Sequence, residues 1–141
     1  MSTENTNTIT VHCDIKAPIE KVWRYYTEPA HIMHWNFASD DWHTPRTTND
    51  LKVGGHFTIR MESKDGSFGF DFTGQYTTII PNKFIAYTLE DGRKVTVSFS
   101  KDGSITHVYE TFETETMHTA EQQRAGWQAI LDNLKKYTET H

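Results

Sequence analysis

The chain has 141 residues, the length of one domain, and its eight Phe, six Tyr and four Trp give it an aromatic content that disordered sequences lack. The formal net charge of −5 argues against a nucleic-acid surface, and no apolar run is long enough for a membrane span or a signal peptide. The one cysteine, Cys13, cannot form an internal disulfide, so stability is expected to come from a packed core in a cytoplasmic protein.

The first part of the chain predicts a strand followed by two helices. Residues 1–8 are polar and are expected to form a flexible tail, and residues 9–141 are expected to form one domain because no linker or repeat divides them. Residues 9–15 alternate apolar and polar side chains, which predicts a half-buried strand. Pro18 suits the first position of a helix, whose apolar residues recur at helical spacing. Pro29 ends this helix and begins a second, short helix to about residue 35.

Residues 36–51 show no clear periodicity and are expected to form an irregular connection, of the kind that often makes a lid or rim. From residue 53 onward the alternation has a period of two and is interrupted by turn sequences at Lys64-Asp65-Gly66, Pro81-Asn82, Asp91-Gly92 and Asp102-Gly103. These turns separate five strands, the last from about residue 104 to 114, which predicts an antiparallel meander.

The end of the chain returns to helical spacing, from about residue 117 to 137. Thr119 and Gln122 have the spacing of a capping box, and Gly126 inside the helix suggests the close approach of another backbone. The order of elements predicts an α+β, helix-grip fold. In it, a six-stranded curved antiparallel sheet wraps around the long C-terminal helix, and two short helices follow the first strand.

Several short motifs occur in an order that is more specific than any of them alone. They are Ala17-Pro18-Ile19-Glu20-Lys21-Val22-Trp23, Thr27-Glu28-Pro29 with Trp35, Asp50 with Val53-Gly54-Gly55, Gly74 ahead of Ile80-Pro81-Asn82-Lys83, and Gly126-Trp127 with Leu131 and Leu134. Together they resemble the heat-shock-protein-90 ATPase activator homologue family of the START-related, SRPBCC superfamily. The resemblance covers about residues 9–137. The sequence Trp35-Asn36-Phe37 departs from the family pattern, which often has a second aromatic residue directly after the tryptophan.

The resemblance implies a helix-grip fold with a cavity between the concave face of the sheet and the C-terminal helix. It further implies that a small hydrophobic ligand binds there, and it allows contact with a chaperone or with a second copy of the chain. The residues expected to line the cavity are Trp35, Phe57, Ile59, Phe70, Phe72, Tyr76, Val97, Phe99, Glu110, Trp127 and Leu131.

The number of aromatic residues supports a cavity independently of the resemblance. Phe68, Phe70 and Phe72 alternate along one predicted strand and would share a face with the other strand aromatics. Each buried ring contributes about 150–250 Å² of buried surface, so a domain of this size hardly needs so many of them merely to fold. The alternative interpretation is an ordinary packed core. Small-molecule sites typically combine such apolar walls with a few polar groups.

The alternation leaves open which face of the last strand points inward. One face carries Thr106, Val108, Glu110 and Phe112, and the other carries His107, Tyr109 and Thr111. The apolar Val108 and Phe112 favour the first face, which would put Glu110 in an apolar cavity with a raised pKa. Such a carboxyl could act as a general acid or base, or it could be a satisfied core group.

No complete catalytic or metal-binding set is visible in the sequence, so no catalytic residue, metal or cofactor is expected. His31 and His34 lack the further ligands that a zinc site needs and are interpreted as a solvated edge beside Trp35. Cys13 alternates with apolar residues and is expected to be buried rather than nucleophilic. The sequence therefore predicts a small-molecule-binding domain. Two alternatives stay open: a cyclase- or hydratase-type enzyme using Glu110, His107 or a tyrosine, and a chaperone-interaction module.

Overall fold

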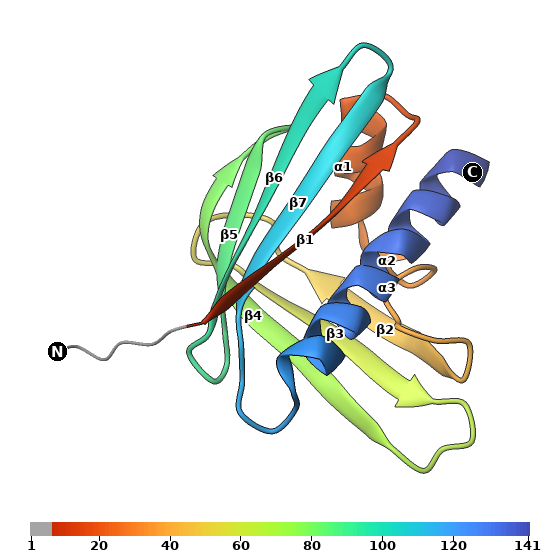
Figure 1. Cartoon of the computed structure of the whole chain (residues 1–141), viewed down its shortest axis with the longest axis vertical. Helices are drawn as coiled ribbons and strands as arrows, with labels where there is room; N and C mark the ends of the chain where they lie inside the picture. Colours follow the sequence, from red (N-terminus) through yellow and green to blue (C-terminus); the bar gives the residue numbers. More distant parts are fainter. Residues whose placement is uncertain (1–6) are drawn as a thin grey trace, which may run out of the picture.

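A computed structural model describes residues 7–141, so the expected N-terminal tail lies almost entirely outside the described residues, and Thr8 is already part of the first strand. The elements in chain order are β1 (Thr8–Ile15), α1 (Ile19–Thr27), α2 (Pro29–Ile32), β2 (Trp42–Asn49), β3 (His56–Ser63), β4 (Gly69–Ile80), β5 (Phe84–Leu89), β6 (Lys94–Asp102), β7 (Ile105–Glu113) and α3 (Ala120–Thr140) (Figure 1).

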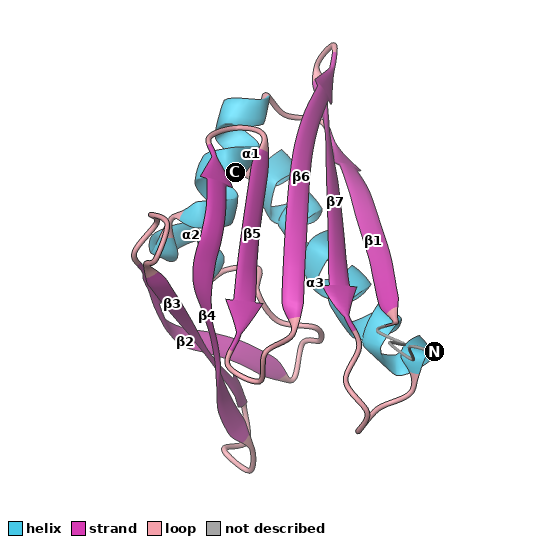
Figure 2. Ribbon diagram, turned by 90° about the vertical axis from the view of Figure 1, so that its left-hand side faces the viewer, coloured by secondary structure: helices cyan, strands magenta, loops and turns pink. Residues whose placement is uncertain are grey.

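The strands form one antiparallel sheet in the order β1-β7-β6-β5-β4-β3-β2. Figure 2 shows this sheet in front of all three helices, which lie together on its other face. The α+β helix-grip fold is thus confirmed, and the predicted five-strand meander corresponds to β3–β7. The described residues contain seven strands rather than the six expected, so the predicted strand count was wrong.

The additional strand is β2, which occupies most of the region expected to be irregular. Within residues 7–141 it pairs only with β3, and its register shifts between His43 and Arg46. Pro45 lies within this shift, where its missing N–H is tolerated because β2 is an edge strand. Thr44 is the one fully buried residue of β2, so the strand lacks the apolar alternation that identifies strands in a sequence.

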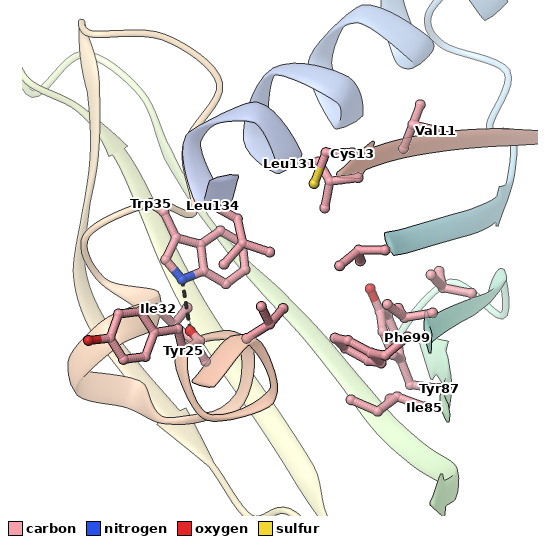
Figure 3. Close-up of a cluster of buried hydrophobic side chains, with 14 of the residues drawn as sticks. Val11, Cys13, Tyr25, Ile32, Trp35, Ile85, Tyr87, Phe99, Leu131 and Leu134 are labelled. Atoms are coloured by element: carbon pink, nitrogen blue, oxygen red, sulfur yellow. Dashed lines mark hydrogen bonds between the residues drawn. The ribbon is translucent and has the colours of Figure 1, made fainter. Parts of the chain in front are cut away.

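The core fills the space between the sheet and the helices. Figure 3 shows side chains from β1, α1, α2, the sheet centre and α3 meeting there. Leu131 and Leu134 of α3 are fully buried, and the Trp35 indole N–H donates a 2.9 Å hydrogen bond to the backbone carbonyl of Tyr25. This bond fixes the segment after α2 against α1.

The helix α3 begins at the predicted capping box. The Thr119 hydroxyl accepts a hydrogen bond from the Gln122 N–H, and the Gln122 side chain accepts one from the Thr119 N–H. The helix lies three residues further along the chain than expected at each end. Across residues 7–141, no helix combines the length and the apolar character that a membrane span requires.

One side of α3 is attached to the outer edge of β1 through polar side chains. The Gln128 amide donates a 2.9 Å hydrogen bond to the His12 carbonyl and accepts a longer one, of 3.4 Å, from the His12 N–H. Arg124 and Lys135 donate to the carbonyls of the neighbouring edge residues, Thr10 and Asp14. Backbone groups of β1 that have no strand partner on this side are thereby hydrogen-bonded.

Candidate functional site

A cavity of about 420 Å³ lies between α3 and the sheet, a volume within the range of small-molecule sites. Strands β3, β4, β5 and β7 contribute to one wall and α3 to the other. Residues of α1, of the connection from α2 to β2, of the start of β2, of the β5–β6 turn and of the β7–α3 loop also line the cavity. Exposed lining residues form its rim: Phe70, Ala38, Ser39, His118 and Gln122.

Aromatic rings form much of the apolar lining. Trp127 of α3 stacks on Phe112 of β7 with 4.1 Å between ring centroids and meets Phe72 of β4 edge to face at 5.9 Å. At the rim, Trp42 and Phe70 lie 6.0 Å apart. Because Trp127 is only partly buried and lines the cavity, part of its ring faces open space instead of packed atoms.

The sheet contributes one buried carboxyl group to the cavity, that of Glu110, which is 5% exposed. Its neighbours across the strands are Val11 of β1 and Val97 of β6. The Tyr26 hydroxyl of α1 donates a 2.6 Å hydrogen bond to Glu110 Oε2. Burial raises the pKa of Glu110 to about 7, against the lowering effect of the Tyr26 hydrogen bond.

The structure thus answers the question that the alternation of β7 left open. The face with Val108, Glu110 and Phe112 is buried. On the opposite face, His107 Nδ1 lies 2.6 Å from Asp14 Oδ1, and Tyr109 is 43% exposed. His107 and Tyr109 are therefore not available to a ligand in the cavity.

Further polar groups line the inner part of the cavity. Burial, together with the nearby Glu110, raises the pKa of both Tyr26 and Tyr87 well above the ordinary value, so both hydroxyls stay protonated and act as hydrogen-bonding groups at neutral pH. Asn36 is buried beside them, and its Oδ1 has no hydrogen-bond partner within the described part of the chain. At neutral pH the inner part of the cavity therefore combines a titrating carboxyl with uncharged hydrogen-bonding groups.

The eleven predicted cavity residues fall into three groups. Those that line the main cavity are Trp35, Phe70, Phe72, Glu110 and Trp127. Phe57, Ile59 and Tyr76 line a smaller space of about 40 Å³, to which Trp35 and Phe72 also contribute. Val97, Phe99 and Leu131 are buried in the core and line neither space.

Phe68 does not join the aromatic face expected from its alternation with Phe70 and Phe72. It precedes the first residue of β4, Gly69, and is 70% exposed. Phe70 is 47% exposed and Phe72 is partly buried, so exposure rises toward the β3–β4 hairpin. The predicted alternation is present along β4, but the end of this face that carries Phe68 lies beyond the part of the sheet that other elements cover.

Sequence analysis missed the contributions of α1, of the connection after α2, of the β7–α3 loop and of most of α3. It also missed four residues in or between strands: Trp42, Met61, Tyr87 and Arg93. The α3 residues that it missed include Gln122, Gly126 and Ile130, which occur at intervals of four and so lie on one face of a helix. This regular spacing was the available signal. Residues 36–39 of the connection carry no comparable signal because they belong to no regular element.

Gly126 does not mark the close approach of another backbone, so that interpretation was wrong. A Cβ atom built on Gly126 meets no atom within 4 Å, since the position faces the cavity. We expect Gly126→Ala to raise the free energy of unfolding by about 0.5–1 kcal/mol, because alanine favours the helix and nothing obstructs its methyl group. Urea denaturation measures this change.

Gly74 provides the matched control for this prediction. A Cβ atom at Gly74 would lie 2.7 Å from the ring of Phe57, so Gly74→Ala should destabilise the protein. A loss of stability in Gly126→Ala would show that the helix is packed against another group at this position.

The residues considered for metal binding and nucleophilic catalysis have structural partners. His31 Nδ1 lies 2.8 Å from the Tyr137 hydroxyl, and the His34 ring stacks on Tyr137, so both pack against α3 instead of forming a solvated edge only. Within residues 7–141, no three His, Cys, Asp or Glu side chains are grouped as a metal site requires. Burial raises the pKa of the Cys13 thiol above its ordinary value, which disfavours the reactive thiolate.

Comparisons with known proteins agree with this architecture. Residues 16–139 match the family described as activator of Hsp90 ATPase homolog 1-like protein. The chain is similar to the solution structure of an AHSA1-like protein from Aeromonas hydrophila, with 46% identity and a TM-score of 0.89 over 95% of this chain and 93% of that one.

Two further solved structures illustrate the range of the likeness. A protein from Cytophaga hutchinsonii is 49% identical, with a TM-score of 0.80 over 96% of this chain and 93% of that one. A protein from Chromobacterium violaceum shares the fold, with a TM-score of 0.85 at 23% identity over 94% of this chain and 98% of that one. Comparison with curated protein sequences gave no match.

Proposed function

Because the chain belongs to the activator of Hsp90 ATPase homolog 1-like family, we propose that it binds a small hydrophobic ligand, planar and aromatic or lipid-like, in the cavity between α3 and the sheet. The observation that carries the proposal is the cavity of about 420 Å³ with its lining of aromatic rings. Such a volume and lining are typical of sites that bury a small organic molecule.

The packing of the rings favours the interpretation of the cavity as a ligand site over its interpretation as an empty void in the core. Trp127 rests on Phe112 on one side, and Trp127 and Phe72 both line the cavity. Ring surface without neighbouring atoms forgoes dispersion contacts, which an apolar ligand would restore. Protein interiors otherwise approach crystalline packing density, so a void of this size is costly unless something occupies it.

A thermal-shift screen tests the proposal. We expect planar apolar ring compounds to raise Tm, because binding stabilises the folded state by about 2.7 kcal/mol when free ligand exceeds Kd a hundredfold. Phe72→Ala should weaken every hit, since Phe72 lines the cavity. Phe68→Ala is the matched control, because Phe68 is exposed and lies outside the cavity. If no planar aromatic compound or lipid shifts Tm, the proposal is wrong.

The family description favours a second candidate function, contact with a heat-shock-protein-90 chaperone. Stimulated ATP hydrolysis by the purified chaperone in the presence of this protein would support that candidate. Ligand binding is the first choice because it accounts for the cavity, which a role in chaperone contact does not require. A cytoplasmic location is part of the proposal, and the free, buried Cys13 is consistent with a reducing compartment.

A further inference from the structure

Resting on the proposed function, we infer which chemical class of ligand the cavity selects: a planar apolar molecule with a hydroxyl group that donates a hydrogen bond to the Glu110 carboxylate. Carboxylic acids of the same skeleton are rejected.

Glu110 is poorly compensated for a buried carboxylate. An ionised carboxylate accepts hydrogen bonds at two oxygens with about four lone-pair sites. Among the described residues, Tyr26 is the one side chain that donates to it, and the bond goes to Oε2. The strand neighbours on either side are valines, Val11 and Val97, which donate nothing from their side chains. A ligand donor in the adjoining cavity would therefore supply a hydrogen bond that the protein leaves unmade.

No cation neutralises Glu110 within the described part of the chain. The groups that face it from neighbouring elements are Tyr26 of α1, Tyr87 of β5 and Cys13 of β1, all neutral at physiological pH because burial raises their pKa. Arg93, which also lines the cavity, is held 2.8 Å from Asp91 by its own ion pair. A ligand carboxylate would thus meet a like charge in an apolar site, whereas a hydroxyl would form a charge-assisted hydrogen bond.

The remaining titratable groups of the cavity lie at its rim. Glu115 and His118, both from the β7–α3 loop, pair with each other at 2.7 Å. Asn36 also lines the cavity, and its buried Oδ1 is a second acceptor that receives no hydrogen bond within the described residues. Two acceptors without sufficient donors make the inner cavity selective for molecules that bring a donor with them.

Three probes with one ring system test this selectivity by isothermal titration: 2-naphthol, 2-methoxynaphthalene and 2-naphthoic acid. At pH 8 we expect 2-naphthol to bind about tenfold more tightly than the methyl ether, the loss expected for one hydrogen bond to a charged buried group. 2-Naphthoic acid should bind more weakly than both. The preference for 2-naphthol over the ether should shrink at pH 6, because Glu110, with a pKa of about 7, is then mostly protonated.

The variant Glu110→Gln removes the charge and should abolish most of the preference for 2-naphthol over the ether. Glu113→Gln is the matched control, since Glu113 lies on the same strand outside the cavity, and it should keep the preference. Equal binding of 2-naphthol and its ether by the wild-type protein at pH 8 overturns the inference and leaves the proposed function standing. Absence of binding by all three probes also overturns the inference, whereas the proposed function is overturned only if the wider thermal-shift screen of planar aromatic compounds and lipids fails as well. The pH comparison needs no variant, so it decides even if Glu110→Gln does not fold.

Discussion

Phe112→Ala is expected to lower the free energy of unfolding by about 3–5 kcal/mol, the range for phenylalanine truncations in packed cores. Phe112 has no exposed surface, and in the sheet it pairs with Ile9 on one side and Val95 on the other. Its ring face is covered by Trp127 at 4.1 Å. Removing the ring therefore loses contacts on all sides and leaves a cavity that the sheet backbone cannot close.

Trp127→Ala removes a larger ring but should cost less than Phe112→Ala. Part of the indole already faces the cavity, so fewer packed contacts disappear with it. Urea or guanidinium denaturation of the two variants gives the comparison. A loss for Trp127→Ala that exceeds the loss for Phe112→Ala would mean that the cavity is closed around the indole. A loss within measurement error would place Trp127 on the surface.

The second large effect is a dependence of stability on pH that comes from Glu110. Its pKa is about 7 in the folded protein, against an ordinary value of 4.5. The folded state therefore holds this proton at pH values where the unfolded state has released it. Stability should be greatest below about pH 4.5 as far as Glu110 is concerned, fall as the pH rises to 7, and stay level above that. At about 1.4 kcal/mol per pKa unit, the total loss is about 3 kcal/mol.

Glu110→Gln isolates this contribution, because glutamine resembles the protonated acid and can still accept the hydrogen bond from Tyr26. Denaturation at pH 5 and pH 8 should find the variant close to the wild type at pH 5 and more stable by up to about 3 kcal/mol at pH 8. Subtracting the stability of the wild type from that of the variant at each pH cancels the contribution of His31. Burial lowers the pKa of His31, so its effect on stability has the opposite sign to that of Glu110. Parallel pH profiles would show that Glu110 is not desolvated.

Most of the fold could be predicted because the strands β3–β7 and β1 alternate apolar and polar residues between recognisable turns. The edge strand β2 could not, because its residues bury little surface and so carry no apolar alternation. β2 is defined by its hydrogen-bonded pairing with β3, and the residues of one strand do not by themselves indicate such a pairing. The capping box of α3 was predictable because its hydrogen bonds join residues only three positions apart.

The cavity was less predictable than the fold. The apolar residues that flank Glu110 on β7, Val108 and Phe112, favoured its inward position, but the alternation left both faces of the strand open until the structure placed it. The hydrogen bond from Tyr26 to Glu110 could not be predicted. Trp23, Tyr25 and Tyr26 are distributed around α1, and helical spacing alone does not say which of these rings reaches the sheet. Gly126 illustrates the same limit: a glycine in a helix suits both a close contact and an open space, and only the distances distinguish them.

The side chains with which α3 covers the edge of β1 also affect how copies of this protein meet one another. An uncovered strand edge is a template on which a second molecule can extend the sheet, the first step toward fibrils. Gln128, Arg124 and Lys135 occupy the backbone groups that such a molecule would need. At the other end of the sheet, Pro45 and the register shift of β2 interrupt the edge. The helix that lines the cavity therefore also opposes polymerisation, because its side chains occupy the edge of β1. Any event that detaches α3 would expose this edge to self-association.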